Sequence, residues 1–117
     1  MSQDRCHWSI WRVNLDPTVG AEIKKVRPAC VVSSDALGVL PIKLVAPITE
    51  WKDRYENSLW HVRVDPDATN GLTKPSSVDT LQSRGLDTSR FVEKPGTLSA
   101  ETMEEIAVAI AAVVEYD

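Results

Sequence analysis

Apolar and polar residues alternate along several short stretches of the chain, in the two-residue period that is typical of β-strands. Residues 11–15 read Trp-Arg-Val-Asn-Leu, and residues 59–64 read Leu-Trp-His-Val-Arg-Val. Residues 42–48 are almost continuously apolar, which indicates a largely buried strand. Further strands are predicted to begin at Arg27-Pro28 and to cover residues 76–82.

Turn-forming residues separate these strands. Gly, Pro, Asp and Asn gather over residues 16–20, 35–38 and 65–71, where their backbone preferences favour chain reversal. Residues 51–57 are polar and indicate a flexible loop, and residues 87–91 are compatible with a helical turn. Many short strands at close spacing predict a mainly β fold with α, built as a small curled sheet or barrel. The length of 117 residues fits one domain, residues 1–117.

The C-terminal segment carries the signals of an α-helix. Pro95-Gly96 marks the break before it, Ser99 is the expected N-cap, and Glu101 adds negative charge to the first turn. Apolar residues with a 3.6-residue period follow: Met103, Ile106, Ala107, Ile110 and Val114. The other side is also apolar, with Val108, Ala109, Ala112 and Val113. We therefore expect one face of the helix to pack on the sheet and another to meet a second subunit or a partner.

The distribution of charge matters more than the net charge of -4. All 13 basic residues precede residue 101, whereas five of the 17 acidic residues follow residue 100. The first hundred residues are therefore close to neutral and compatible with a local cationic groove. This balance is weaker than that of a protein that coats a long nucleic acid, and it fits an enzyme that contacts a few nucleotides.

No stretch approaches the roughly 18 apolar residues of a membrane span, and residues 1–5 are not followed by the apolar region of a signal peptide. We therefore expect a cytoplasmic protein without a membrane partner. Cys6 and Cys30 are the only cysteines, and the apolar run around Cys30 predicts a buried thiol rather than a disulfide. No Cys or His pair has the spacing of metal ligands, so no metal site is predicted.

Arg27 stands out among the charged residues. It follows the turn that contains Gly20 and directly precedes Pro28, which restricts Arg27 to extended backbone angles. Pro28 lacks an N–H and therefore suits the first position of a strand better than the middle of a ladder. The guanidinium is accordingly expected at the end of a strand.

Several short motifs, taken in their order along the chain, resemble a known family. They are Val13-Asn14-Leu15-Asp16-Pro17, Gly20, Glu22, Arg27-Pro28, Val31-Val32-Ser33, Ala46-Pro47-Ile48-Thr49, Gly71-Leu72, Ser76-Ser77-Val78, Leu81-Gln82-Ser83-Arg84, Arg90 and Gly96-Thr97-Leu98-Ser99. From about residue 8 to residue 115, this order is similar to the MazF/PemK toxins of bacterial toxin–antitoxin pairs. The resemblance implies an SH3-type barrel with a C-terminal helix, a homodimer, a small antitoxin as partner, and cleavage of single-stranded RNA without a metal or other cofactor.

Such a reaction, in which the ribose 2′-OH attacks the neighbouring phosphate, needs a cation, oriented donors and a route for protons. The planar fork of Arg27 matches phosphate oxygens and stays charged at any working pH. Thr49 follows a predicted strand, from which its hydroxyl can donate to a phosphate oxygen. Glu22, in the same turn as Arg27, either orients that arginine or accepts the proton of the 2′-OH. These three residues are the predicted catalytic set.

Five further residues are predicted to contact RNA. Lys24 and Lys25, which stand where many relatives have small residues such as Gly, would attract phosphates. Trp51 would stack on a base. Gln82 and Arg84 match the Gln and Arg of a family segment near the RNA groove, and Gln82 either reads a base edge or joins strands.

Two alternatives of other classes remain open. A toxin like CcdB, built on the same kind of barrel, would poison DNA gyrase by protein contact and cut nothing. A catalytically degenerate relative would only bind its antitoxin. His7 and His61, as an acid–base pair, are a weaker candidate, because His61 alternates within a predicted strand.

Overall fold

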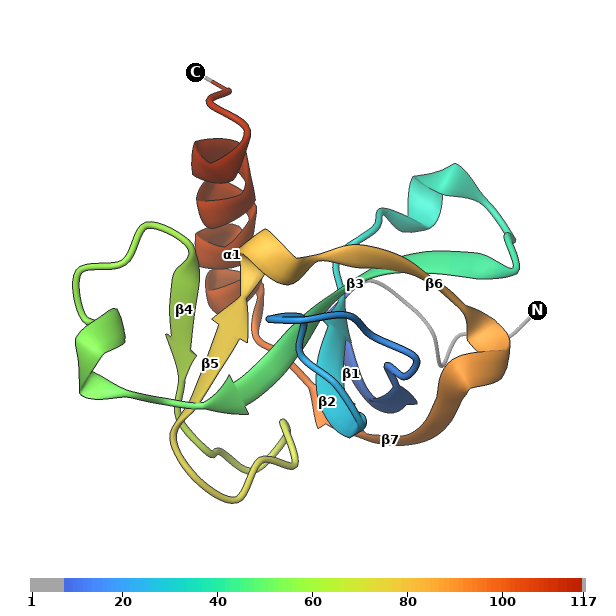
Figure 1. Cartoon of the computed structure of the whole chain (residues 1–117), viewed down its shortest axis with the longest axis horizontal. Helices are drawn as coiled ribbons and strands as arrows, with labels where there is room; N and C mark the ends of the chain where they lie inside the picture. The colour runs from blue at the N-terminus through green and yellow to red at the C-terminus, as the bar shows by residue number, and fades with distance from the viewer. Residues whose placement is uncertain (1–7, 117) are drawn as a thin grey trace.

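The computed structural model describes residues 8–116, which form one curled antiparallel sheet and one α-helix (Figure 1). The strands are β1 (Ser9–Asn14), β2 (Val26–Val31), β3 (Ile42–Glu50), β4 (His61–Val64), β5 (Ser76–Asp79), β6 (Arg84–Asp87) and β7 (Phe91–Thr97). The helix is α1 (Ala100–Val113), and four short 3-10 turns connect strands: η1 (Asp35–Leu37), η2 (Asp53–Tyr55), η3 (Thr80–Gln82) and η4 (Thr88–Arg90).

The long strand β3 connects the two halves of the sheet, whose order is β4-β5-β3-β2-β1-β7. Its first half pairs with β6, as in Leu44↔Gly85, and its second half with β5, as in Thr49↔Ser77. Every pairing is antiparallel. Among the described residues β7 pairs with β1 and β6 with β3, so the expected curled sheet forms but hydrogen bonds do not close it into a barrel.

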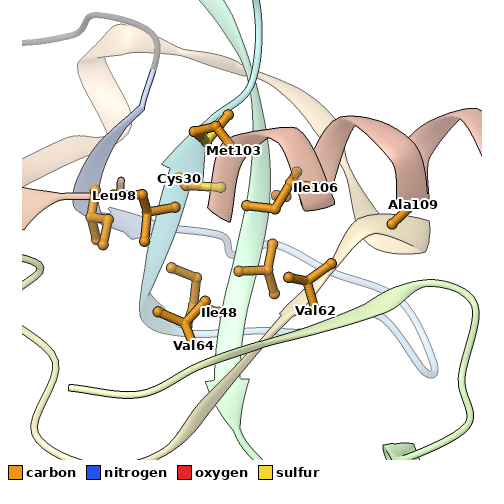
Figure 2. Close-up of a cluster of buried hydrophobic side chains, with 11 residues drawn as sticks. Cys30, Ile48, Val62, Val64, Leu98, Met103, Ile106 and Ala109 are labelled. Atoms are coloured by element: carbon orange, nitrogen blue, oxygen red, sulfur yellow. The ribbon is translucent and has the colours of Figure 1, made fainter. Parts of the chain in front are cut away.

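Helix α1 covers one face of this sheet (Figure 2). Ser99 caps it as predicted, since its hydroxyl accepts a hydrogen bond from the Thr102 N–H at 3.1 Å. The cluster under the helix contains Ile10, Cys30, Ala46, Ile48, Val62, Val64, Val78, Leu98, Met103, Ile106 and Ala109. Burial in this cluster raises the pKa of the Cys30 thiol to about 12, and the thiol is free, as expected.

The prediction of which helix residues pack on the sheet is partly wrong. Met103 and Ile106 are buried, but Ala109 completes the buried row, whereas Ala107 and Val114 are exposed. Ile110, also predicted for this face, is partly buried and packs against the same cluster, so the contact follows spacings of three and four residues. Val108 and Val114 leave apolar surface away from the sheet.

The strand boundaries differ from the sequence prediction in several places. β4 begins at His61, so Leu59 and Trp60 precede it and are exposed. The last three residues of the predicted strand 76–82 form η3 instead. The polar segment 51–57 contains the turn η2. The helical turn in 87–91 is confirmed as η4, with the Asp87 carboxylate accepting from the Ser89 N–H.

Two strands, β6 and β7, are missing from the sequence prediction, and Pro95-Gly96 lies inside β7 rather than in a break. β7 tolerates the proline because its pairing with β1 is irregular, with two register shifts. Gly96 is required there, because a Cβ atom at this position would lie 2.2 Å from the Thr69 carbonyl oxygen. In the described part of the chain, no helix is long and apolar enough to span a membrane.

Candidate active site

Two prolines mark the place where β2 and β3 separate. The ladder between these strands runs from Val31↔Val45 to Ala29↔Pro47. Pro28 and Pro47 have no N–H to donate, so they cannot extend the ladder with their own nitrogens. β2 begins at Val26, so Pro28 is its third residue, and the prediction that Pro28 occupies the first position of the strand is wrong.

A groove of about 710 Å³ lies beyond this ladder and is bordered by both strands. It is lined by Arg12, Ile23, Arg27, Pro28, Ile48, Thr49, Glu50, Lys52, Tyr55, Gly71, Leu72, Thr73, Lys74, Ser76, Asp79, Gln82, Glu93 and Pro95. The groove therefore brings together three of the eight predicted site residues, Arg27, Thr49 and Gln82.

Arg27 is the second residue of β2 and is exposed. Its Nε donates to the Lys24 carbonyl at 3.3 Å, which fixes one edge of the guanidinium. The terminal nitrogens make no hydrogen bond or ion pair with any other residue in 8–116. They can therefore grip an anion in the groove.

Thr49 lies inside β3 and not after it, because the ladder with β5 continues to Glu50↔Ser76. The strand alternation places Thr49 on the same face as Pro47 and its partner Ser77. Its side chain is half-buried, and its hydroxyl has no hydrogen-bond partner within residues 8–116. The hydroxyl is accordingly available as a donor.

Most other charges in the groove are paired. Glu50 accepts a hydrogen bond from Lys74 at 3.1 Å and lies 3.8 Å from the Lys52 ammonium. This hydrogen bond and the two positive charges lower the pKa of Glu50. Arg12 forms an ion pair with Glu93 at 3.4 Å. Two arginines among the described residues line the groove. Arg12 is paired with Glu93, whereas Arg27 forms no ion pair with any residue in 8–116.

Glu22 lies in a neighbouring hollow of about 650 Å³, which it lines together with Gln82 and Arg84. Its carboxylate accepts a hydrogen bond from the Val19 N–H at 2.7 Å, so it stabilises its own loop. The structure does not place Glu22 among the lining residues of the Arg27 groove.

Gln82 borders both hollows and holds the loop between β1 and β2. Its Oε1 accepts from the Ile23 N–H at 2.6 Å, and its Nε2 donates to the Ala21 carbonyl at 3.3 Å. Arg84 donates from Nη1 to the Leu15 carbonyl at 3.1 Å. Both side chains therefore support the loop that leads to Arg27.

The lysine pair lies on the surface of that same loop. Lys24 and Lys25 are exposed, and neither lines the groove. Lys25 has a φ of 73°, in the left-handed region that favours glycine. Its N–H donates to the Asp16 carboxylate at 3.1 Å, and its carbonyl accepts from the Leu15 N–H at 3.0 Å, which holds this conformation.

Trp51 occupies a different place, a hollow between the end of β3, β4 and α1. Its ring contacts Tyr55 edge-on, with 5.7 Å between the ring centroids, and the Arg63 guanidinium lies 5.2 Å from its ring centroid. The structure does not bring Trp51 together with Arg27 and Thr49.

Sequence reasoning missed several groove residues, among them Arg12, Lys52, Lys74 and Asp79. Alternation in β5 could have placed Asp79 on the face of Ser77, but the sequence carried no signal for the register of β5 with β3 and β4. His7 lies outside the described residues. Within residues 8–116, no group of three or more His, Cys, Asp or Glu side chains is placed to hold a metal ion.

The comparisons with known proteins agree with one another. Residues 7–114 match the sequence model of a family described as PemK-like, MazF-like toxin of type II toxin–antitoxin system. The structure is similar to that of the toxin MazF-mt6 of Mycobacterium tuberculosis, with 26% identity, a TM-score of 0.75, and coverage of 93% of this chain and 98% of that one. No curated protein sequence matches the chain significantly.

Two further solved structures share the fold. MazF from Deinococcus radiodurans has 23% identity and a TM-score of 0.78, over 94% of this chain and 96% of that one. A mycobacterial endoribonuclease in complex with its cognate antitoxin has 16% identity and a TM-score of 0.72, over 96% of both chains. At these identities the likeness concerns the fold alone.

Proposed function

Because the chain belongs to the PemK-like, MazF-like toxin family of type II toxin–antitoxin systems, we propose that it is a sequence-selective endoribonuclease that cuts single-stranded RNA without a metal ion. One observation carries the proposal: Arg27 and Thr49, on two strands that separate at Pro28 and Pro47, line the same groove. A groove with an unneutralised arginine and an unpartnered hydroxyl suits a phosphodiester.

The proposed reaction needs no covalent enzyme intermediate. The ribose 2′-oxygen forms a bond to the adjacent phosphorus, the bond from phosphorus to the 5′-oxygen breaks, the 2′-OH loses its proton, and the 5′-oxygen gains one. The products are a 2′,3′-cyclic phosphate and a 5′-OH. Arg27 binds the non-bridging oxygens, whose charge grows in the transition state, and Thr49 donates a hydrogen bond to one of them.

Glu22 keeps two proposed roles, as support of the Arg27 loop or as acceptor of the 2′ proton. Its hydrogen bond to Val19 favours the first role. Lys24 and Lys25, exposed on that loop, would attract RNA phosphates. Gln82, Arg84 and Trp51 complete the proposed RNA contacts, with Gln82 and Arg84 acting mainly through the loop that they hold.

The partners belong to the same proposal. We place the protein in the cytoplasm as a homodimer, with exposed apolar residues of the C-terminal segment, Val108 in α1 and Val114 directly after it, in contact with the second subunit. A small antitoxin would bind along the groove and block it. The Deinococcus radiodurans MazE–MazF complex has the same fold in its toxin chain, at 23% identity.

The test is an RNA cleavage assay with purified protein in EDTA. We expect the wild type to cut a long single-stranded RNA at one recurrent short motif and to leave 5′-OH ends. The variant Arg27→Ala should lose about 100-fold or more of the rate, because it removes the main charge on the transition state. Lys94→Ala is the control for the loss of one positive charge, since Lys94 is an exposed residue of β7 that does not line the groove.

The outcomes separate the function classes. If the wild type leaves the RNA intact, the proposal is contradicted and a toxin with a protein target is favoured. The next assay is then gyrase supercoiling. Equal losses in Arg27→Ala and Lys94→Ala would show that general positive charge, not the groove, sets the rate.

A further inference from the structure

Asp79 is a carboxylate in the wall of the groove that the proposed chemistry does not use. It is the last residue of β5, lines the groove, and is only 8% exposed. Asp79 pairs in register with His61 of β4. Because side chains alternate along β5, Asp79 lies on the same face as Ser77 and its partner Thr49, opposite to Val78. Asp79 is therefore built into the sheet next to the proposed catalytic residues.

His61 holds one side of this carboxylate. Its Nε2 lies 3.7 Å from Asp79 Oδ2, and its ring stacks on Tyr55 with 3.7 Å between the ring centroids. The other nitrogen, Nδ1, lies 2.7 Å from the Ser58 hydroxyl oxygen. That oxygen already accepts from the N–H groups of Trp60 and His61, so its own proton goes to Nδ1. The neutral ring then carries its proton on Nε2, towards Asp79.

The carboxylate nevertheless lacks a normal hydrogen bond. The contact at 3.7 Å is longer than a hydrogen bond, and Oδ1, which is buried, has no hydrogen-bond partner among residues 8–116. Buried polar atoms without partners are uncommon, because their desolvation is not compensated. An acceptor fixed in a groove wall in this state is suited to a donor that the substrate supplies.

The nature of that donor follows from charge. The other groove carboxylates, Glu50 and Glu93, are neutralised by lysines and by Arg12, whereas within residues 8–116 the ion-pair contact of Asp79 is with the ring of His61 alone. A phosphate would be repelled by the negative charge of Asp79. The part of a nucleotide that brings donors without negative charge is the base edge, and the exocyclic amino groups of cytosine, adenine and guanine are such donors.

We propose that Asp79 is a specificity-determining residue, which accepts a hydrogen bond from the exocyclic amino group of one base in the bound single-stranded RNA. This inference rests on the proposed endoribonuclease function. It assigns Arg27 and Thr49 to the phosphate and Asp79 to the base, so different residues of one groove bind different parts of the same substrate.

The experiment measures base discrimination rather than activity alone. Once the cleavage motif of the wild type is mapped, each motif position is changed to all four bases in a set of short RNAs, and the relative cleavage rates are measured. We expect one position at which an amino-bearing base is preferred over uracil by about 10-fold or more. In Asp79→Leu, which has no acceptor, this preference should fall to near one while the other positions keep theirs.

Two further variants make the test decisive. Asp79→Asn keeps the shape and one weaker acceptor, so it should relax the same position about threefold or more, even if the leucine variant does not fold. Glu93→Gln removes a negative charge from the same groove and should leave the preference at every position unchanged. Relaxation of the same position by Glu93→Gln would overturn the assignment to Asp79.

The remaining outcomes are equally clear. If a folded Asp79 variant keeps the wild-type base discrimination, the inference is overturned. This holds whether its cleavage rate is unchanged or is lowered equally at all motifs, because the carboxylate would then serve folding or proton transfer. A wild type that cuts no RNA overturns the proposed function itself. Loss of cleavage in Arg27→Ala with unchanged discrimination in the Asp79 variants would retain that function and remove only this inference.

Discussion

The two faces of the β3–β5–β4 region serve different purposes although they share the same strands. On one face Ile48, Val78 and Val62 lie in register across the three strands and pack beneath α1. One residue further along, the opposite face carries the row Thr49, Ser77 and Arg63. The first row is buried and entirely apolar, and the second is polar and borders the groove at Thr49.

The difference shows how a small sheet can combine stability and chemistry. Alternation with a period of two sends neighbouring residues to opposite faces, so one helix covers the apolar face, while the opposite face borders the groove at Thr49. Substitutions on the helix-covered face should therefore change the free energy of unfolding, and those on the groove face should change the rate of cleavage. Ile106, which packs on the covered face from α1, and Thr49, which lines the groove, test this separation.

Ile106→Ala should have the largest effect on stability. Ile106 is fully buried in the cluster under α1 and does not line the groove, so truncation removes buried apolar surface and leaves a cavity. We expect a loss of about 2–5 kcal/mol in the free energy of unfolding, measured by urea denaturation, with near-normal cleavage wherever the protein remains folded. A loss below about 1 kcal/mol would mean that the helix contact is looser than the structure indicates.

Thr49→Val should show the opposite profile. The change keeps the shape of a half-buried side chain and removes the hydroxyl, which has no hydrogen-bond partner among residues 8–116. The unfolding free energy should stay close to that of the wild type, and the RNA cleavage rate should fall about 10-fold or more, as expected for loss of a hydrogen bond to a charged group. Thr49→Ser is the control that restores the hydroxyl. A valine variant with the wild-type rate would remove Thr49 from the proposed mechanism.

The sequence predicts one side of this comparison better than the other. Apolar periodicity and the cap at Ser99 are local signals, and they locate α1 correctly. β6 and β7 have no such signal, since Gly85 interrupts one and Pro95-Gly96 the other. Their strand conformation comes from pairing with β3 and β1, which are distant in sequence.

The candidate site shows the same limit. The family resemblance supplies Arg27, Thr49 and Gln82, and all three line one groove. It does not reveal that Gln82 is engaged by the loop backbone or that Trp51 lies in another hollow. The pairing of Asp79 with His61 could not be predicted from the sequence, because it depends on the register of β4 and β5.

Ser99→Ala tests whether the two faces are independent when the helix itself is weakened. The variant removes the cap that accepts from Thr102 N–H. It should cost about 1 kcal/mol of unfolding free energy, measured by thermal or urea denaturation, and leave the cleavage motif unchanged. Ser99→Asp should restore the stability, because a carboxylate also caps a helix and favours its N-terminus. An altered motif in the alanine variant would show that the helix influences the groove.

The smallest expected effect is a pH dependence of the free energy of unfolding that arises from His61, which pairs with Asp79 on the groove face. Burial, and to a lesser extent the charge of Arg54, lower the pKa of His61, while the charge of Asp79 acts in the opposite direction. The folded protein therefore keeps this ring neutral at pH values where the unfolded chain, with an ordinary histidine pKa of about 6.5, binds a proton. The unfolded state then binds more protons, so stability falls as the pH drops below about 6.5 and this contribution is complete above it.

Urea denaturation between pH 7.5 and 5 measures this effect, with His61→Gln as the comparison. The wild type should lose stability on acidification more steeply than the variant, because glutamine does not titrate. The pKa values of Asp67 and Asp87 are lowered by backbone N–H groups, so their contribution is lost at more acidic pH and equally in both proteins. Parallel curves for the two proteins would mean that the ring is as accessible to protons in the fold as in the unfolded chain, and the face that borders the groove would then contribute only to chemistry.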